Sequence, residues 1–263
     1  MNKKAILIVS FGTSHSDTKK NTIDQIELDI KNAYPEYMIY RAFTSKIIIK
    51  ILKNRDGINI STVAEAMERM KMDGVEEVIV QPTHILNGIE NDSMIQDVNF
   101  YKKGFNSIKF GAPLLNSTAD YWRVIGAFVK KLPKISKHEA IVCMGHGTEH
   151  YTNAAYAALD YMLKDDGYDD IYVATVEAYP ALTDIIKRLK KNKYNKIILT
   201  PFMIVSGDHA KNDMAGVQGK SWRTILEKEG FEVSCVLEGL GENEEIRRIF
   251  VDHIKDAKQA ATC

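Results

Sequence analysis

Short apolar stretches rich in β-branched residues alternate along the chain with longer segments in which apolar residues recur every three or four positions. The short stretches predict strands and the longer segments predict amphipathic helices. Some stretches are apolar throughout, as at 6–9 (ILIV) and 197–199 (IIL). Strands of this kind are buried on both faces, which is typical of a parallel sheet covered by helices. The predicted strands lie at residues 5–10, 38–43, 75–82, 107–113, 140–144, 171–176, 196–202 and 232–237.

The second half of the chain repeats the first at three strand ends. Residues 10–13 (SFGT) resemble 145–148 (GHGT), residues 41–43 (RAF) resemble 177–179 (EAY), and Pro82 with Gly88 resembles Pro201 with Gly207. The third match is displaced by fewer residues than the other two, which predicts an additional helix near 62–72 in the first half. Thr62 and Glu65 have the spacing of a capping box at its start. We therefore predict an α/β fold of two duplicated lobes, residues 1–132 and 133–263, each with a four-stranded parallel sheet flanked by helices.

Composition and charge exclude several classes of protein. The 263 residues carry 35 basic and 35 acidic side chains, so no net field attracts nucleic acid or an anionic membrane. No apolar run approaches the roughly 20 residues of a membrane span, and the apolar run near the N-terminus is too short for a signal peptide. Cys143, Cys235 and Cys263 form no C-x-x-C pair, and the first two lie in strand-like runs that predict buried thiols. These features predict a soluble cytoplasmic protein.

Three residues that can bind metal follow consecutive strands of the second half. They are His146, Glu177 and His209, each about one βα repeat from the next. Ligands of open α/β sheets bind beyond the carboxyl ends of the strands, so these side chains are expected to meet. Two imidazoles and one carboxylate suit Zn²⁺, Co²⁺, Ni²⁺ or Fe²⁺ with positions left open for a substrate. The alternatives are hydrogen-bonded loop histidines with a solvated glutamate, or a phosphate-binding turn at 145–148, although that turn matches neither G-x-x-x-x-G-K-S/T nor G-x-G-x-x-G.

Several segments together resemble the anaerobic sirohydrochlorin cobaltochelatases. They are 144–148 (MGHGT), 176–180 (VEAYP), 201–203 (PFM) and 207–210 (GDHA), with 10–13 (SFGT) and 84–88 (HILNG) in the first half. The resemblance covers nearly the whole chain. It implies two flavodoxin-like lobes with a tetrapyrrole-binding cleft between them, and ATP-independent insertion of Co²⁺ into sirohydrochlorin on the way to cobalamin. It also implies that His146, Glu177 and His209 hold the metal.

The chemistry of metallation suggests roles for the remaining candidates. The ion must lose water and the ring must lose two pyrrole protons, so His146, Glu177 and His209 are also the predicted catalytic residues. The first half has Phe11, Arg41 and Glu90 where the second has these three. An ordinary ion pair is the alternative for Arg41, and a structural loop histidine is the alternative for His84. The expected substrate-binding residues are Phe11, Gly12, Thr13, Arg41, His84, Glu90 and Gly147.

The expected ligands and partners follow from these assignments. Co²⁺ is the substrate metal, Zn²⁺, Ni²⁺ or Fe²⁺ can occupy the same donors, and no organic cofactor is expected. The partner is the tetrapyrrole sirohydrochlorin, without nucleic acid or membrane, and a homo-oligomer is left open. Alternative functions are a ferrochelatase or nickel chelatase for a related tetrapyrrole, a metal-dependent hydrolase, and a non-catalytic metal or tetrapyrrole carrier.

Overall fold

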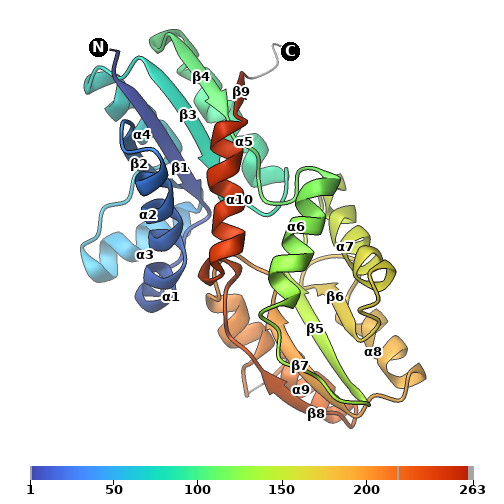
Figure 1. Ribbon diagram of the computed structural model, residues 1–263. Coiled ribbons are helices and arrows are strands. Elements are labelled where there is room, and N and C mark those ends of the chain that lie inside the picture. Colours follow the sequence, from blue (N-terminus) through green and yellow to red (C-terminus); the bar gives the residue numbers. More distant parts are fainter. Residues whose placement is uncertain (1, 218, 260–263) are drawn as a thin grey trace. The chain divides into compact units, whose positions relative to one another are not determined.

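The computed structural model describes residues 2–217 and 219–259, which form two compact units (Figure 1). The first unit contains the chain up to residue 124 and again from residue 244, and the second contains residues 125–243. Within the described ranges, no helix combines the length and the apolar composition needed to cross a membrane.

The first unit is built on a sheet with the strand order β2-β1-β3-β4-β9. The first four strands are parallel, and the short β9 pairs with β4 in the antiparallel direction. Residues 5–9 of β1 are 0% exposed, as expected for a strand covered on both faces. The strands are β1 (Lys4–Ser10), β2 (Met38–Phe43), β3 (Glu77–Pro82), β4 (Ser107–Phe110) and β9 (Lys258–Gln259).

Helices pack against this sheet through buried apolar side chains. On α4, for example, Met67 and Met70 are buried against the strands. The predicted capping box is confirmed at the start of α4, where the Thr62 side chain accepts from the backbone of Glu65 and Glu65 reaches back to Thr62. The helices are α1 (Ser16–Asn21), α2 (Ile23–Ala33), α3 (Lys46–Asp56), α4 (Val63–Met72), α5 (Ile89–Phe100), η1 (Lys102–Gly104), α6 (Thr118–Val129) and α10 (Glu244–Lys255).

The second unit has a parallel sheet with the order β6-β5-β7-β8, so β5 lies between β6 and β7. Its core gathers apolar side chains from the strands and from α8 and α9, among them Tyr172, Leu189 and Trp222. The strands are β5 (Glu139–Gly145), β6 (Ile171–Thr175), β7 (Lys196–Pro201) and β8 (Glu232–Cys235). The helices are η2 (Tyr151–Asn153), α7 (Ala154–Asp165), α8 (Leu182–Lys191), η3 (His209–Met214), α9 (Trp222–Lys228) and η4 (Leu240–Glu242).

The two sheets repeat one topology, as the predicted duplication requires. The orders β2-β1-β3-β4 and β6-β5-β7-β8 are equivalent. Two helices, α3 and α4, join β2 to β3, whereas α8 joins β6 to β7 in the second unit, and this difference accounts for the displaced third match. The turns after β1 and β5 also agree. Thr13 Oγ1 accepts from the backbone of His15, and Thr148 Oγ1 accepts from that of His150, both at 3.2 Å.

The division of the chain differs from the one expected at residues 132 and 133. α6 passes from the first unit to the second after Val124, and α10 with β9 belongs to the first unit. α10 packs on α2, where Arg247 Nε donates to Asp29 at 2.6 Å. At its other end, buried His253 lies 3.0 Å from a carboxylate oxygen of Asp120. Sequence periodicity predicts that a segment is an amphipathic helix, but not which sheet the helix covers.

The cysteines confirm the predicted thiol environment only in part. Cys143 in β5 is buried and Cys235 in β8 is half-buried, and both are free. Burial raises the pKa of both thiols, so both are protonated at neutral pH. Cys263 lies outside the described residues.

Candidate functional site

A tight turn after β5 positions His146. Gly147 has φ 85°, a left-handed conformation that favours glycine. A Cβ added at Gly147 would lie 2.9 Å from Cβ of Thr175, and one at Gly145 would lie 2.4 Å from the ring of Tyr156. The space beside both glycines is therefore filled by the protein itself. Gly147 therefore shapes the turn that carries His146, and its expected part in substrate binding stays a prediction.

Three adjacent strands bring His146, Glu177 and His209 together. His146 directly follows β5, Glu177 lies two residues beyond β6, and His209 begins η3 after β7. The backbone N–H of Glu177 donates to the His146 carbonyl at 3.0 Å, which ties the first two loops to each other. The Glu177 carboxylate lies 3.5 Å from His146 Nδ1, and the rings of His146 and His209 meet edge to face with centroids 4.7 Å apart.

These three side chains are accessible, and each imidazole has a partner at Nδ1. The exposed fractions are 41% for His146, 53% for Glu177 and 38% for His209. Nδ1 of His146 lies 3.0 Å from the Gly147 carbonyl, and Nδ1 of His209 lies 2.6 Å from the Asp213 carboxylate. In the part of the chain that the structure describes, no three His, Cys, Asp or Glu side chains are already arranged around one point as metal ligands. The donors His146, Glu177 and His209 lie close together, and their side chains must rotate before they can surround an ion.

Of the first-half residues expected to bind substrate, those in the turn after β1 differ in accessibility. Phe11 is 44% exposed at the end of the strand. Thr13 is buried and its hydroxyl accepts from His15. Gly12 has φ 102°, and an added Cβ would lie 2.5 Å from the ring of Phe43. Gly12 and Thr13 therefore shape the turn, and only Phe11 presents a side chain to an approaching ligand.

Arg41 forms internal ion pairs. Its guanidinium donates through Nε and one terminal nitrogen to Glu27, with the Nε bond at 2.6 Å, and through the same terminal nitrogen to Asp24 at 2.5 Å. Two carboxylates already compensate its charge. The structure therefore favours the alternative of an ordinary ion pair over the expected partner for substrate carboxylates.

His84 and Glu90, the other first-half candidates, lie on either side of the start of α5. Glu90 is exposed in the first turn of that helix. His84 is only 9% exposed, and neither of its ring nitrogens has a hydrogen-bond partner among the described residues. Burial lowers the pKa of His84 to about 4, so its ring is neutral at pH 7. The buried ring is withdrawn from a ligand, which favours the structural role for His84.

The buried neutral ring of His84 predicts a loss of stability in acid. The unfolded chain binds a proton near pH 6.5 and the folded chain only near pH 4, so the free energy of unfolding falls between these values. The expected contribution is on the order of 3 kcal/mol. Urea unfolding at pH 7.5 and pH 4.5 measures it, and His84→Gln should reduce the difference between the two pH values. An equal acid loss in both chains would contradict the assignment.

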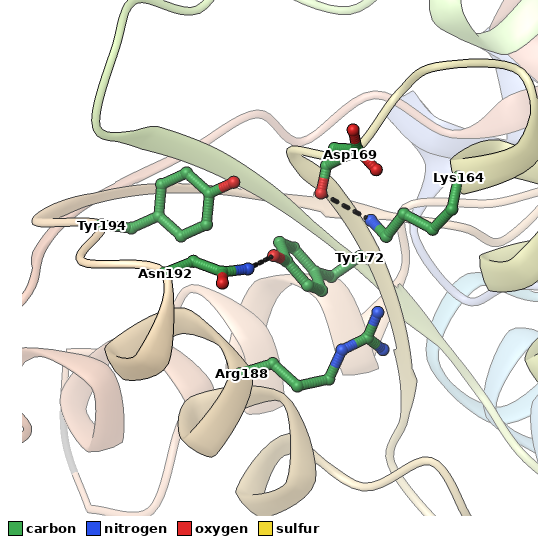
Figure 2. Close-up of a pocket in the computed structure, with 6 residues that line it drawn as sticks. All are labelled: Lys164, Asp169, Tyr172, Arg188, Asn192 and Tyr194. Carbon is green, nitrogen blue, oxygen red and sulfur yellow. Dashed lines mark hydrogen bonds between the residues drawn. The ribbon is translucent and has the colours of Figure 1, made fainter.

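A separate cavity of about 580 Å³ opens near the amino end of β6 (Figure 2). Lys164 and Arg188 both lie against the ring of Tyr172, at 3.9 and 4.7 Å from its centroid. Lys164 donates to the Asp169 carbonyl at 2.9 Å, and Arg188 pairs with Asp160 at 2.8 Å. Their charges are therefore engaged by the protein. Glu177 follows the opposite end of the same strand, so this cavity is not part of the His146 site.

Comparison with known families shows which family the chain belongs to. The model of the cobalt chelatase (CbiK) family matches residues 4–259. The chain belongs to this family. Sirohydrochlorin cobaltochelatase of Salmonella typhimurium is 39% identical over 259 residues and is covered to 98%, as is this chain. Sirohydrochlorin cobaltochelatase CbiKC of Nitratidesulfovibrio vulgaris is 31% identical over 267 residues, with 99% of this chain and 92% of the relative covered.

Solved structures of chelatases share the fold of this family member. SirB from Bacillus subtilis with Fe³⁺ has a TM-score of 0.67 at 13% identity, covering 97% of this chain and 95% of SirB. CbiX, described as the terminal enzyme for siroheme biosynthesis in denitrifying bacteria, has a TM-score of 0.57 at 14% identity, covering 98% of this chain and 100% of CbiX. At these identities the likeness concerns the fold, and it agrees with the predicted pair of α/β lobes.

Three further residues, in the segments after β5, β6 and β7, were not proposed as functional from the sequence. Asp213 contacts His209 from one turn further along η3, and the exposed Tyr151 and Tyr179 lie in the loops after β5 and β6. The spacing of four residues between His209 and Asp213 was visible in the sequence. This spacing predicts a contact between the two side chains only if both residues lie in one helix.

Proposed function

We propose that this chain inserts Co²⁺ into sirohydrochlorin without ATP, in the biosynthesis of cobalamin. The observation that carries the proposal is the convergence of His146, Glu177 and His209 at three adjacent strand ends in a member of the cobalt chelatase family. The two curated relatives named sirohydrochlorin cobaltochelatase support the same metal and macrocycle, because they align over nearly their whole length.

The donor set suits a metal that has to be bound and then released. Two imidazole nitrogens and one carboxylate can replace part of the water around Co²⁺ while other coordination positions stay open. A half-exposed set lets the macrocycle approach the bound ion from solvent. As the ion enters, four ring nitrogens replace the protein donors, and two pyrrole N–H protons leave the macrocycle. One divalent ion replaces two protons, so the reaction involves no change in oxidation state.

The same side chains can receive those protons. A neutral imidazole accepts a proton near neutral pH, and an ionised carboxylate can pass one on. His146 follows β5 directly in a closely packed turn, so its backbone position is closely defined. We assign His146 to the face of the ring, where it holds the metal and, once the ion has passed to the ring nitrogens, accepts a pyrrole proton. Glu177 and His209 are assigned to metal delivery.

Two exposed tyrosines support a flat aromatic substrate. Tyr151 is 83% exposed in η2 and Tyr179 is 69% exposed two residues after Glu177. Asn153 Nδ2 donates to the Tyr179 carbonyl at 2.6 Å, which joins the two loops that carry them. Aromatic side chains stack on other π-systems through offset or edge contacts. In the proposed function these rings contact the macrocycle close to the donors.

A metallation assay tests the proposed function. Sirohydrochlorin in excess over the protein is mixed with Co²⁺, and the change in visible absorbance is followed against a protein-free sample. We expect faster metallation than in the blank, and more product than protein, because an enzyme turns over. Parallel samples with Fe²⁺ and Ni²⁺ separate the cobalt activity from the two alternative chelatases.

Two outcomes would contradict the proposal. A rate equal to that of the protein-free sample would exclude catalysis. Product that stops at one equivalent of protein would instead indicate a carrier. The cytoplasmic location remains a prediction, and localisation of a tagged full-length chain tests it.

A further inference from the structure

His209 has a carboxylate partner within its own helix. It is the first residue of η3, a π-helix, and its Nδ1 lies 2.6 Å from Oδ2 of Asp213. The two residues are four positions apart, so they lie on neighbouring turns of the same side. A carboxylate in this position is the arrangement that orients many metal-binding histidines, because it fixes which ring nitrogen carries the proton.

We propose that Asp213 is a positioning residue that holds His209 with Nε2 directed to the metal. An ionised carboxylate can only accept, so Nδ1 of His209 must carry the hydrogen and Nε2 keeps its lone pair. Asp213 acts through His209 and does not itself touch the metal. This proposal rests on the proposed function, since it assigns His209 to metal delivery.

Buried anchors fix the geometry of this pair. Ala210 and Met214, each one residue after His209 and Asp213, are 0% exposed and hold η3 against the core. The backbone N–H of Ala215 donates to the Ala210 carbonyl at 3.1 Å, the five-residue spacing of a π-helix. Because both anchors are held, His209 and Asp213 are presented together to solvent. π-helical turns inside proteins occur frequently at functional sites.

The two histidines of the site differ in what supports them. Nδ1 of His146 lies 3.0 Å from the neutral carbonyl of Gly147 and 3.5 Å from the Glu177 carboxylate, whereas Nδ1 of His209 lies 2.6 Å from the Asp213 carboxylate, within hydrogen-bond distance. Both arrangements leave Nε2 as the donor. The carboxylate strengthens the ligand it supports, because its negative charge favours the positive charge that metal binding places on the ring. His209 is therefore the stronger metal ligand, consistent with a role in capture rather than proton transfer.

Co²⁺ binding to the complete chain, without tetrapyrrole, tests this role. Asp213→Ala is expected to weaken Co²⁺ binding by about 10–100-fold, the usual effect of removing such a partner. Asp213→Asn keeps an acceptor oxygen without the charge and should fall between Asp213→Ala and the unaltered chain. Asp208→Ala is the matched control, because Asp208 is a second aspartate that lies just before η3, and its carboxylate accepts from Asn212 at 2.8 Å. Isothermal titration with Co²⁺ provides the affinities.

Two further measurements separate positioning from a structural effect. In the double variant His209→Ala/Asp213→Ala, the loss of Co²⁺ affinity should equal that of His209→Ala alone, because Asp213 acts only through His209. Long-range ¹H–¹⁵N spectra of the metal-free chain should show the Nδ1-protonated form of His209, and a mixture of both forms in Asp213→Ala.

Each result has a defined meaning. Losses that multiply in the double variant, unchanged Co²⁺ affinity in Asp213→Ala, or an unchanged His209 spectrum would each overturn the positioning role. If Asp213→Ala alters both the spectrum and the affinity, but the unaltered chain does not metallate sirohydrochlorin, the positioning role stands and the proposed function fails.

Discussion

Replacing His146 with alanine is expected to abolish Co²⁺ insertion, and an excess of Co²⁺ is not expected to restore it. In the proposed mechanism His146 accepts a pyrrole proton, and a lost proton acceptor cannot be replaced by more metal. His146 directly follows β5, in a turn fixed by Gly147 and its packing against Thr175, so its imidazole is held at this strand end. General base catalysis contributes about 10²–10⁴-fold to a rate, so the loss should be of this order.

The comparison with His209→Ala makes this result specific. His209 is assigned to metal delivery, and a lost delivery ligand lowers affinity, which mass action can offset. The initial metallation rate of His209→Ala should therefore be low at limiting Co²⁺ and should rise as the concentration is increased. The measurement is the initial rate as a function of Co²⁺ concentration for the unaltered chain and both variants.

Two other patterns of rescue by excess Co²⁺ would change the roles assigned to His146 and His209. If excess Co²⁺ rescues His146→Ala but not His209→Ala, the two roles are exchanged. If it rescues both variants fully, neither histidine is the proton acceptor. The exposed Glu90 of α5 would then be the first alternative, since the neutral, buried ring of His84 is withdrawn from the solvent.

Replacing Gly145 with alanine is expected to lower both the stability of the protein and its metallation rate. The new Cβ would lie 2.4 Å from the ring of Tyr156, which is buried in α7. Either the ring or the end of β5 must move, and overpacking of this kind destabilises a protein by about 1–3 kcal/mol. Because His146 is the next residue, the metallation rate should fall as well. Urea unfolding and the metallation assay measure the two effects.

Gly126→Ala is the matched control for this substitution. Gly126 lies within α6, and an added Cβ there meets nothing within 4 Å. Alanine is the better helix former, so this variant should be more stable by about 0.5–1 kcal/mol and should keep its activity. In Gly145→Ala, the additional change Tyr156→Leu should recover part of the lost stability. Equal effects of both glycine substitutions would contradict the packing argument.

The alternation of hydrophobic and polar residues determined much of this fold. All eight predicted strands are present, with ends that differ by a few residues, because apolar runs and their flanking turns are local features of the chain. The repeated turns also allowed the donors to be proposed from sequence. Residues at equivalent strand ends must come together when the strands are adjacent and parallel, and His146, Glu177 and His209 do so.

The tertiary structure decided which residues are accessible and what each donor contacts. Arg41 and His84 were reasonable candidates from their positions, but one is paired with Glu27 and the other is buried. The C-terminal helix α10 joins the first unit although it follows the second in sequence. Local patterns do not specify such outcomes, because ion pairing and burial depend on segments far apart in the chain. The Asp213 contact with His209 also required the structure, since the four-residue spacing places the carboxylate beside the ring only when both residues lie in one helix, as they do in η3.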